Sequence, residues 1–268
     1  MMEWSEKEDQ LKKESEKESL NNYFLKLSND INIDQMKIFL QEDSQIKVET
    51  IDKVLRQIMS KFENKPEQNT EKVKELFSHA DLNYINSNYN DSNILMDCCK
   101  KGEPILIDLL LITDKNCIKK KKSIEIDIFK VDKNNQNILH YLFNNEYEYD
   151  VIEIFEKIMN YARNNNKNKN KIELLTKEDK NGITPLVIIL KKGWYNLLKE
   201  YFKYFHYKSH IIRSNKNNNI HCAIEGKNIK CLKLLLNYCS YEELNQTNSD
   251  GLTPCLYAKK TNILIWSN

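Results

Sequence analysis

The chain carries the same short pattern three times, and a segmental repeat constrains a fold more than any single residue does. The pattern begins with two small or apolar residues and continues through a polar stretch with a glycine break. It ends in an apolar helix face closed by Leu or aromatic side chains, and its copies occupy residues 98–111, 189–202 and 223–236. Such self-similarity indicates a repeat architecture, because each copy forms one supersecondary unit that buries its apolar face against the next.

A second short motif precedes these copies and occurs five times in all. In each occurrence an apolar residue follows a polar turn, and these apolar residues are Leu95, Leu139, Leu186, Ile220 and Cys255. The steps between these positions are 44, 47, 34 and 35 residues. The last two steps are nearly equal, so we expect a regular repeat there and insertions within the first two steps.

The second motif has the chemistry of a helix start. Thr184 and Thr253 each precede a proline, an order that predicts a hydroxyl N-cap with proline at the first helical position, where its missing N–H costs nothing. In the other copies the predicted caps are Asn93, Asn137 and Asn218. Glycines are predicted to form the turns before the helix, at Gly182 and Gly251, and the C-caps after it, at Gly102 and Gly193.

Segments 181–187 and 250–256 resemble the G-x-T-P-L-H sequence that opens an ankyrin repeat, whose period is about 33 residues. The resemblance implies an all-α fold, an ankyrin-repeat solenoid of stacked helix-turn-helix pairs with short β-hairpin tips. His140 and His221 fall at the histidine of the motif. In ankyrin repeats this histidine ties neighbouring repeats by hydrogen bonds, so we expect a structural role for both rather than a catalytic or metal-binding one.

The resemblance covers residues 49–268 and divides the chain. Residues 1–48 are expected to be a charged N-terminal extension with short helices. The expected units are a degenerate cap repeat at 49–86, repeats at 87–112, 127–162, 172–207 and 208–243, and a partial repeat at 244–268, with insertions at 113–125 and 163–171. The second insertion, rich in Asn and Lys, is predicted to be flexible. The apolar run Ile263–Trp266 stands where a polar cap is expected, so we expect more chain beyond Asn268; the alternative is that the run folds back as a cap.

The sequence contains no pattern typical of a catalytic or metal-binding site. The seven cysteines include no CxxC pair, and we expect Cys98, Cys99 and Cys255 to be small buried hydrophobes in a reducing compartment. Carboxylate pairs such as Glu242-Glu243 are expected in turns, away from any histidine or metal cluster. The sequence contains no phosphate-binding loop, nucleophile elbow, zinc-protease or kinase motif. We therefore predict a protein that is not an enzyme and that uses no cofactor and no metal.

Charge and hydropathy argue against nucleic-acid-binding and membrane-spanning proteins. The net charge is +2 with three arginines, which disfavours nucleic-acid binding, although Lys119–Lys122 could serve as a nuclear localisation signal or a phosphate-binding patch. The apolar runs are too short to span a bilayer. The aromatic residues of 194–205 are at helical spacing and are predicted to be core, with Trp194 as the member most exposed.

The leading functional hypothesis is an intracellular protein–protein interaction scaffold or adaptor, monomeric by itself and cytoplasmic, with the nucleus as the alternative. By the resemblance, a partner would meet the hairpin tips and the polar ends of the inner helices, which form the concave face. These positions are Lys100, Lys101, Lys133, Asn134, Asn144, Lys177, Lys180, Lys191, Lys192, Lys216 and Glu225. Their lysines predict an acidic protein partner. The alternative is a regulatory or substrate-recruiting ankyrin domain of a larger enzyme, such as a palmitoyltransferase, a kinase or a ubiquitin-ligase adaptor.

Overall fold

The computed structural model describes residues 92–102, 104, 107–108, 127–165, 171–205 and 217–261. These residues are mostly helical, and the one extended bridge position among them is Ser92. The chain divides into two compact units, Met1–Cys98 with Ile105–Asp127, and Cys99–Pro104 with Ile128–Asn268. The predicted cap repeat at 49–86, the N-terminal extension and the Lys-rich insertion at 113–125 lie outside the described residues.

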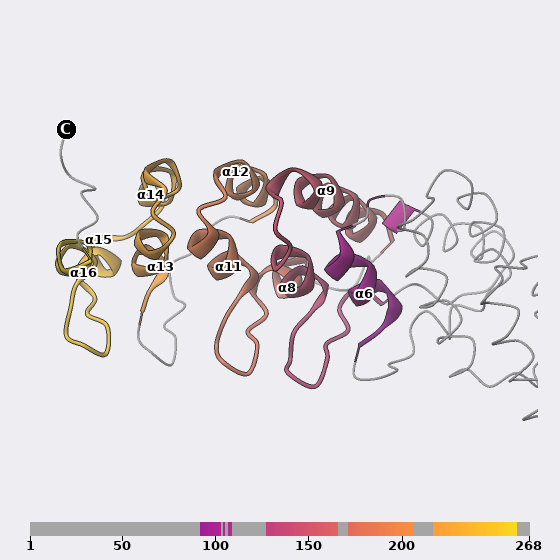
Figure 1. Cartoon of the computed structure of the whole chain (residues 1–268), viewed down its shortest axis with the longest axis horizontal. Helices are drawn as coiled ribbons and strands as arrows, with labels where there is room; N and C mark the ends of the chain where they lie inside the picture. Colours follow the sequence, from indigo (N-terminus) through magenta and orange to yellow (C-terminus); the bar gives the residue numbers. More distant parts are fainter. Residues whose placement is uncertain are drawn as a thin grey trace, which may run out of the picture. The chain divides into compact units, whose positions relative to one another are not determined.

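Ten helices are described, and all of them except the first, which spans the boundary between the units, lie in the second unit; Figure 1 labels them. Their bounds are α6 Ile94–Lys101, α8 Ile138–Phe143, α9 Glu148–Asn165, α10 Lys171–Thr176, α11 Pro185–Lys192, α12 Tyr195–Tyr204, α13 Asn219–Glu225, α14 Ile229–Leu236, α15 Tyr241–Asn245 and α16 Pro254–Lys260. The fold class predicted from the sequence is thus confirmed at the level of helical content.

The second unit arranges its main helices in two rows (Figure 1). The inner row contains α8, α11, α13 and α16, each packed against the next, and the outer row contains α9, α12 and α14. Every outer helix follows an inner helix in sequence and packs on it, as α9 does on α8. Loops extend from the starts of the inner helices to one side of the rows. The architecture is therefore a repeated helix pair with a projecting loop.

Asparagine caps start two inner helices as predicted. The amide oxygen of Asn137 accepts hydrogen bonds from the backbone N–H groups of Leu139 and His140, at 3.0 and 3.2 Å. Asn218 caps α13 in the same way, and in the first unit the side chain of Asn93 accepts from the N–H of Met96 at 2.9 Å. Each cap satisfies backbone donors that the helix itself leaves without a partner.

Threonine caps follow the prediction at one position and depart from it at the other. Thr253 accepts from the N–H of Leu256, but the buried Thr184 hydroxyl has no hydrogen-bond partner among the described residues. The N–H of Val187 donates instead to the backbone carbonyl of Thr184 at 3.0 Å. Val187 lies three residues after the N-cap, the position that His140 and His221 hold in their helix pairs. Thr184 therefore has no histidine ring nitrogen facing it.

The projecting loops share one hydrogen-bond pattern. A side-chain oxygen of Asp132, Asp179 or Asn248 accepts from the backbone N–H groups two and four residues later, at 2.7 to 3.0 Å. Each loop then needs a residue with positive φ, and these residues are Asn135 at 62°, Gly182 at 68° and Gly251 at 72°. The predicted turn glycines are confirmed, and asparagine, which tolerates this conformation, replaces glycine in the first loop.

The core between the rows is aliphatic with an aromatic centre. Phe155 of α9 lies 5.6 Å from Phe143 and stacks at 6.0 Å on Tyr201, measured between ring centroids. Tyr201 is fully buried and donates its hydroxyl to the carbonyl of Leu175 at 2.6 Å. The aromatic residues of α12 therefore contribute to the core as predicted, and Trp194 is half-buried.

Besides the Thr184 cap, the expectations for Cys255 and for Glu242-Glu243 are wrong. Cys98 and Cys99 are fully buried, but Cys255 is exposed, because the described helices α13 and α15 pack on one side of α16. The predicted insertion 163–171 overlaps helices at both ends, since α9 continues to Asn165 and α10 begins at Lys171, and its middle lies outside the described residues, so its flexibility stays a prediction. Glu242 and Glu243 belong to α15 rather than to a turn, because Ser240 and Glu243 form a reciprocal capping box.

Candidate partner-binding face

Histidine side chains join successive inner helices to the next loop. The Nε2 atom of His140 lies 2.9 Å from the carbonyl oxygen of Ile183, and that of His221 lies 3.0 Å from the carbonyl oxygen of Leu252. A carbonyl only accepts, so each Nε2 carries the hydrogen and donates it. The expected structural role of both histidines is confirmed, and each fixes the loop of the following pair against its own helix.

Both histidine rings favour the neutral form. Burial lowers the pKa of His140 and of His221 below the ordinary value of a histidine, against smaller opposing effects of the carbonyl bond and nearby carboxylates. In the neutral ring Nδ1 accepts from the backbone N–H of the capping asparagine, at 3.2 Å for His140. The amide oxygen of Asn137 lies 2.8 Å from the same nitrogen and could accept a second proton on the ring.

Two loop tips bring several of the predicted binding residues together. Lys133 and Asn134 are exposed on one tip and Lys180 is exposed on the next. The backbone N–H of Lys180 donates to the carbonyl of Asn134 at 2.9 Å, which makes these tips immediate neighbours. Lys177 lies nearby but is half-buried. The tips therefore present exposed side chains on a backbone that internal hydrogen bonds hold in place.

The polar end of α11 is paired rather than uniformly basic. Lys191 forms an ion pair with Glu225 of α13, with an Nζ–Oε2 distance of 2.9 Å. The other carboxylate oxygen accepts from the Asn217 amide at 3.0 Å and from the Tyr257 hydroxyl at 3.1 Å. This network crosses three inner helices or their loops, and it compensates the charge of Lys191.

Lys192 is held differently from Lys191. Its Nζ lies 4.3 Å from the centroid of the Trp194 ring and donates to the carbonyl of Asn145. Burial lowers the pKa of Lys192, with the charge of Glu146 acting in the opposite direction. Asn144, the C-cap of α8, precedes Asn145 and Glu146 in the sequence and is exposed. This part of the predicted face is thus a mixture of paired charge, aromatic surface and exposed amide.

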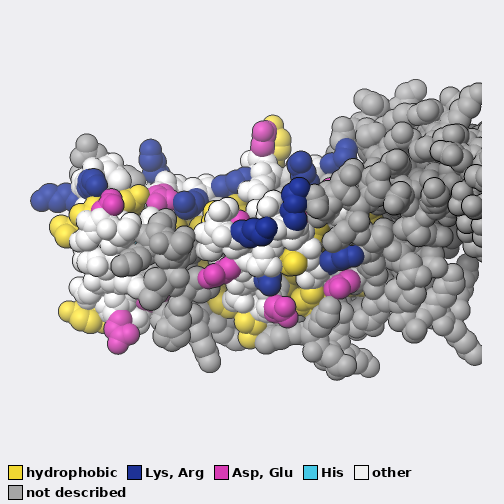
Figure 2. Space-filling model, turned by 90° about the horizontal axis from the view of Figure 1, so that it is seen from below, with side chains coloured by type: hydrophobic (Ala, Val, Ile, Leu, Met, Phe, Trp, Pro, Cys, Tyr) yellow, Lys and Arg dark blue, Asp and Glu magenta, His cyan; other side chains and the backbone are white. Residues whose placement is uncertain are grey.

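The segment of Lys100 and Lys101 adjoins this group, because the Asn145 amide donates to the carbonyl of Cys99 at 2.7 Å. Lys100 is exposed and Lys101 half-buried in the last turn of α6, within the segment Cys99–Pro104. Lys216 lies outside the described residues. Figure 2, viewed from the side of the loops, shows basic and acidic side chains interspersed over the described surface.

Two tyrosines of this face were missed in the sequence. Tyr141 donates its hydroxyl to Asp132 at 3.1 Å, and Tyr257 donates to Glu225 of the preceding pair. Both are the fourth residue after an N-cap, Asn137 or Thr253. That shared register is a signal available in the sequence, because it places both side chains on the same part of an inner helix.

The described ranges contain no group of three or more His, Cys, Asp or Glu side chains that could hold a metal ion. Among the described helices, none combines the length and the apolar character needed to cross a membrane. No protein-family model matches the chain, and no curated protein matches it in sequence.

Proposed function

We propose that the second unit is an ankyrin-type repeat array that acts as a non-catalytic protein-interaction scaffold. The observation that carries this proposal is the recurrence of one built element: a capped inner helix, an Asx-type loop with a positive-φ residue, and an outer helix. In repeat proteins, such elements create an extended surface on which variable side chains contact a partner. Here the loop tips supply that surface.

The charge distribution favours an acidic partner at the tips. Lys133 and Lys180 are exposed on adjacent tips. Electrostatic complementarity at exposed positions acts mainly on specificity and on the rate of association. The partner is therefore an acidic protein surface or peptide that meets the two adjacent tips of Lys133 and Lys180.

The test compares two variants of equal charge change in the intact protein. Lys133→Glu/Lys180→Glu reverses the tips, and Lys199→Glu/Lys233→Glu reverses two exposed lysines on α12 and α14 of the outer row. Binding of poly-glutamate is measured at low and moderate salt, and partners are captured from native-cell extract with each protein. The tip variant should lose both poly-glutamate and the captured partners, while the outer-row variant keeps them. Equal loss in both variants, or retention in both, would refute the placement.

A further inference from the structure

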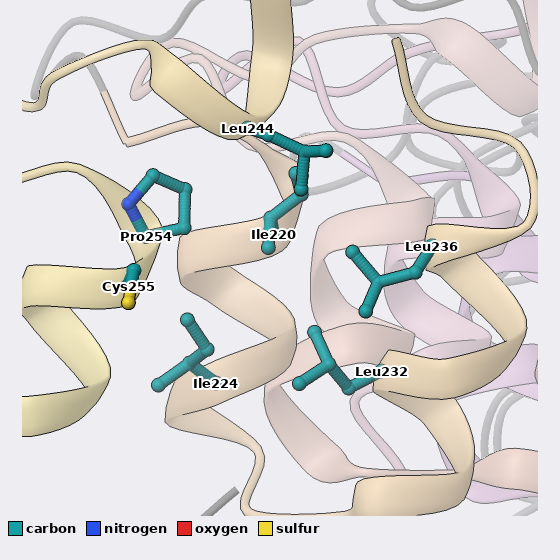
Figure 3. A pocket seen from close by; sticks show the side chains of 7 residues that line it. All are labelled: Ile220, Ile224, Leu232, Leu236, Leu244, Pro254 and Cys255. Carbon is teal, nitrogen blue, oxygen red and sulfur yellow. The ribbon is translucent and has the colours of Figure 1, made fainter. Parts of the chain in front are cut away.

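An apolar pocket opens between the α13–α14 pair and the helices α15 and α16 (Figure 3). In Figure 3 the labelled side chains surround a common space. Its walls come from α13, α14 and α16, through Ile220, Ile224, Leu232, Leu236, Pro254 and Cys255, with one further side chain from α15. These side chains are apolar or, in the case of Cys255, a thiol. The pocket therefore suits a hydrocarbon group and excludes a charged one.

The size of the pocket limits the hydrocarbon that it can hold. Its volume is about 230 Å³. An apolar cavity of about 150 Å³ holds one benzene ring, so this pocket takes an aliphatic chain on the order of eight to ten carbons. A single chain of medium length fits, whereas two long lipid chains do not.

Two exposed lysines flank the pocket, one on each of two walls. Lys233 directly follows the wall residue Leu232 in α14, and it lines an adjoining surface hollow that shares Leu236 with the pocket. Lys259 comes four residues after the wall residue Cys255, a spacing that places both on one face of α16. An apolar interior with cations at its side is the arrangement that an anionic amphiphile requires.

The positive charge beside the pocket is not neutralised within the described part of the chain. Helices α14 and α16 contain no acidic residue. The neighbouring Lys260 is paired, since its Nζ lies 3.4 Å from a carboxylate oxygen of Asp250. Lys233 and Lys259 form no such ion pair with any described residue. A negatively charged group is therefore the complement of this rim.

We propose that this pocket binds a medium-chain fatty acid, with its chain between α13, α14 and α16 and its carboxylate beside Lys233 and Lys259. The chain supplies most of the affinity, because each buried methylene strengthens binding about fourfold. The carboxylate supplies the selectivity for an acid, since exposed ion pairs are weak but depend on the sign of the charge. The bound chain covers the thiol of Cys255, and this inference does not depend on what the loop tips bind.

The thiol of Cys255 reports on the pocket in the full chain, because it is exposed and lines the pocket. Its alkylation by a neutral maleimide is followed by peptide mass at constant ionic strength, with butanoate, hexanoate or octanoate added. Octanoate should slow the reaction, and the affinity should rise about fourfold per methylene along the series. Octanol and octylammonium have the same chain with no charge and with the opposite charge. Octanol should protect more weakly than octanoate, and octylammonium should protect least.

A double variant isolates the contacts of the carboxylate. Lys233→Gln/Lys259→Gln should weaken octanoate about fivefold, the effect of two exposed ion pairs, and should leave octanol unchanged. Lys133→Gln/Lys180→Gln removes the same charge from the loop tips. This matched control should leave the protection by both compounds unchanged.

The same measurements can overturn the proposal. Equal protection by octanoate, octanol and octylammonium would do so, as would no protection by octanoate or an equal effect of the two double variants. The buried thiols of Cys222 and Cys231 monitor unfolding. If they react at the octanoate concentrations that change the Cys255 rate, the acid acts as a detergent and the proposal fails.

Discussion

Gly226, the C-cap of α13, lies at a close approach between two helix pairs, and its replacement by alanine tests how the pairs pack. The backbone there has φ −70° and ψ −9°, which any residue adopts. The α8 C-cap Asn144, with φ −80° and ψ −6°, shows that a side chain is tolerated in this conformation. In the absence of a neighbour, Gly226→Ala would therefore stabilise the protein by about 0.4–1 kcal/mol through the unfolded state.

Contact with the neighbouring helix pair makes Gly226→Ala destabilising instead. A Cβ atom on Gly226 would lie 1.9 Å from the carbonyl oxygen of Leu190, whereas real Cβ contacts stay beyond 3.0 Å. The obstacle is backbone, so α11 and α13 must separate by about an ångström. Forced expansion of a packed contact costs about 1–3 kcal/mol, occasionally more. We expect Gly226→Ala to lower the free energy of unfolding by at least about 1 kcal/mol after the unfolded-state gain is subtracted.

Urea denaturation followed by circular dichroism measures this difference, with Asn144→Ala as the control. The control removes an exposed side chain from the same backbone conformation and should stay within about 0.5 kcal/mol of the wild type. An increase in stability for Gly226→Ala would show that the two pairs do not approach as described and would refute the reasoning.

Further predictions concern the histidine positions. His140→Asn keeps an acceptor near the cap but no longer reaches the carbonyl of Ile183, so we expect a loss of about 1 kcal/mol in urea denaturation; a change below the error of the fit would contradict the tie. Wild-type stability should fall as the pH drops below about 6.5, the ordinary histidine pKa, because the folded protein then binds fewer protons than the unfolded chain. Each of His140 and His221 can add at most about 1.4 kcal/mol per pH unit to the slope, because each ring binds one proton, and the slope should be smaller in His140→Asn, which has one such ring fewer. Val187→His supplies a ring nitrogen for the unpaired Thr184 hydroxyl and should raise stability by about 0.5–1.5 kcal/mol, measured in the same assay; destabilisation would mean that the site lacks room for the ring.

The helix starts and turns could be predicted from the sequence because local chemistry determines them. Asn137, Asn218 and Thr253 cap helices wherever their neighbours lie, and Gly182 and Gly251 take a conformation that few other residues adopt. Their roles could be predicted without knowing any tertiary contact, and the structure confirms them.

The charge of the candidate face could not be predicted in the same way. Lys191 and Lys192 are adjacent and chemically identical in the sequence, yet one pairs with Glu225 and the other lies over Trp194. The difference depends on which helix packs beside each side chain, and Glu225 is 34 residues from Lys191. A count of lysines therefore overestimates the positive charge that a partner would meet.

The contacts between successive helix pairs of the second unit are not equivalent. His140 ties the α8 pair to the next loop, and His221 ties the α13 pair to the loop before α16. Between the α11 and α13 pairs Val187 takes the histidine position, and the contact is made by the close approach at Gly226, by the Lys191–Glu225 ion pair and by the Asn228 amide, which donates to the carbonyl of Gly193 at 2.6 Å. A partly exposed ion pair contributes at most about 1 kcal/mol, so close backbone packing and the Asn228 hydrogen bond supply most of the coupling at this junction. The neighbouring junctions each carry a histidine hydrogen bond, and this one does not. Protonation of His140 or His221 therefore does not act directly on the α11–α13 junction, whereas a side chain added at Gly226 does.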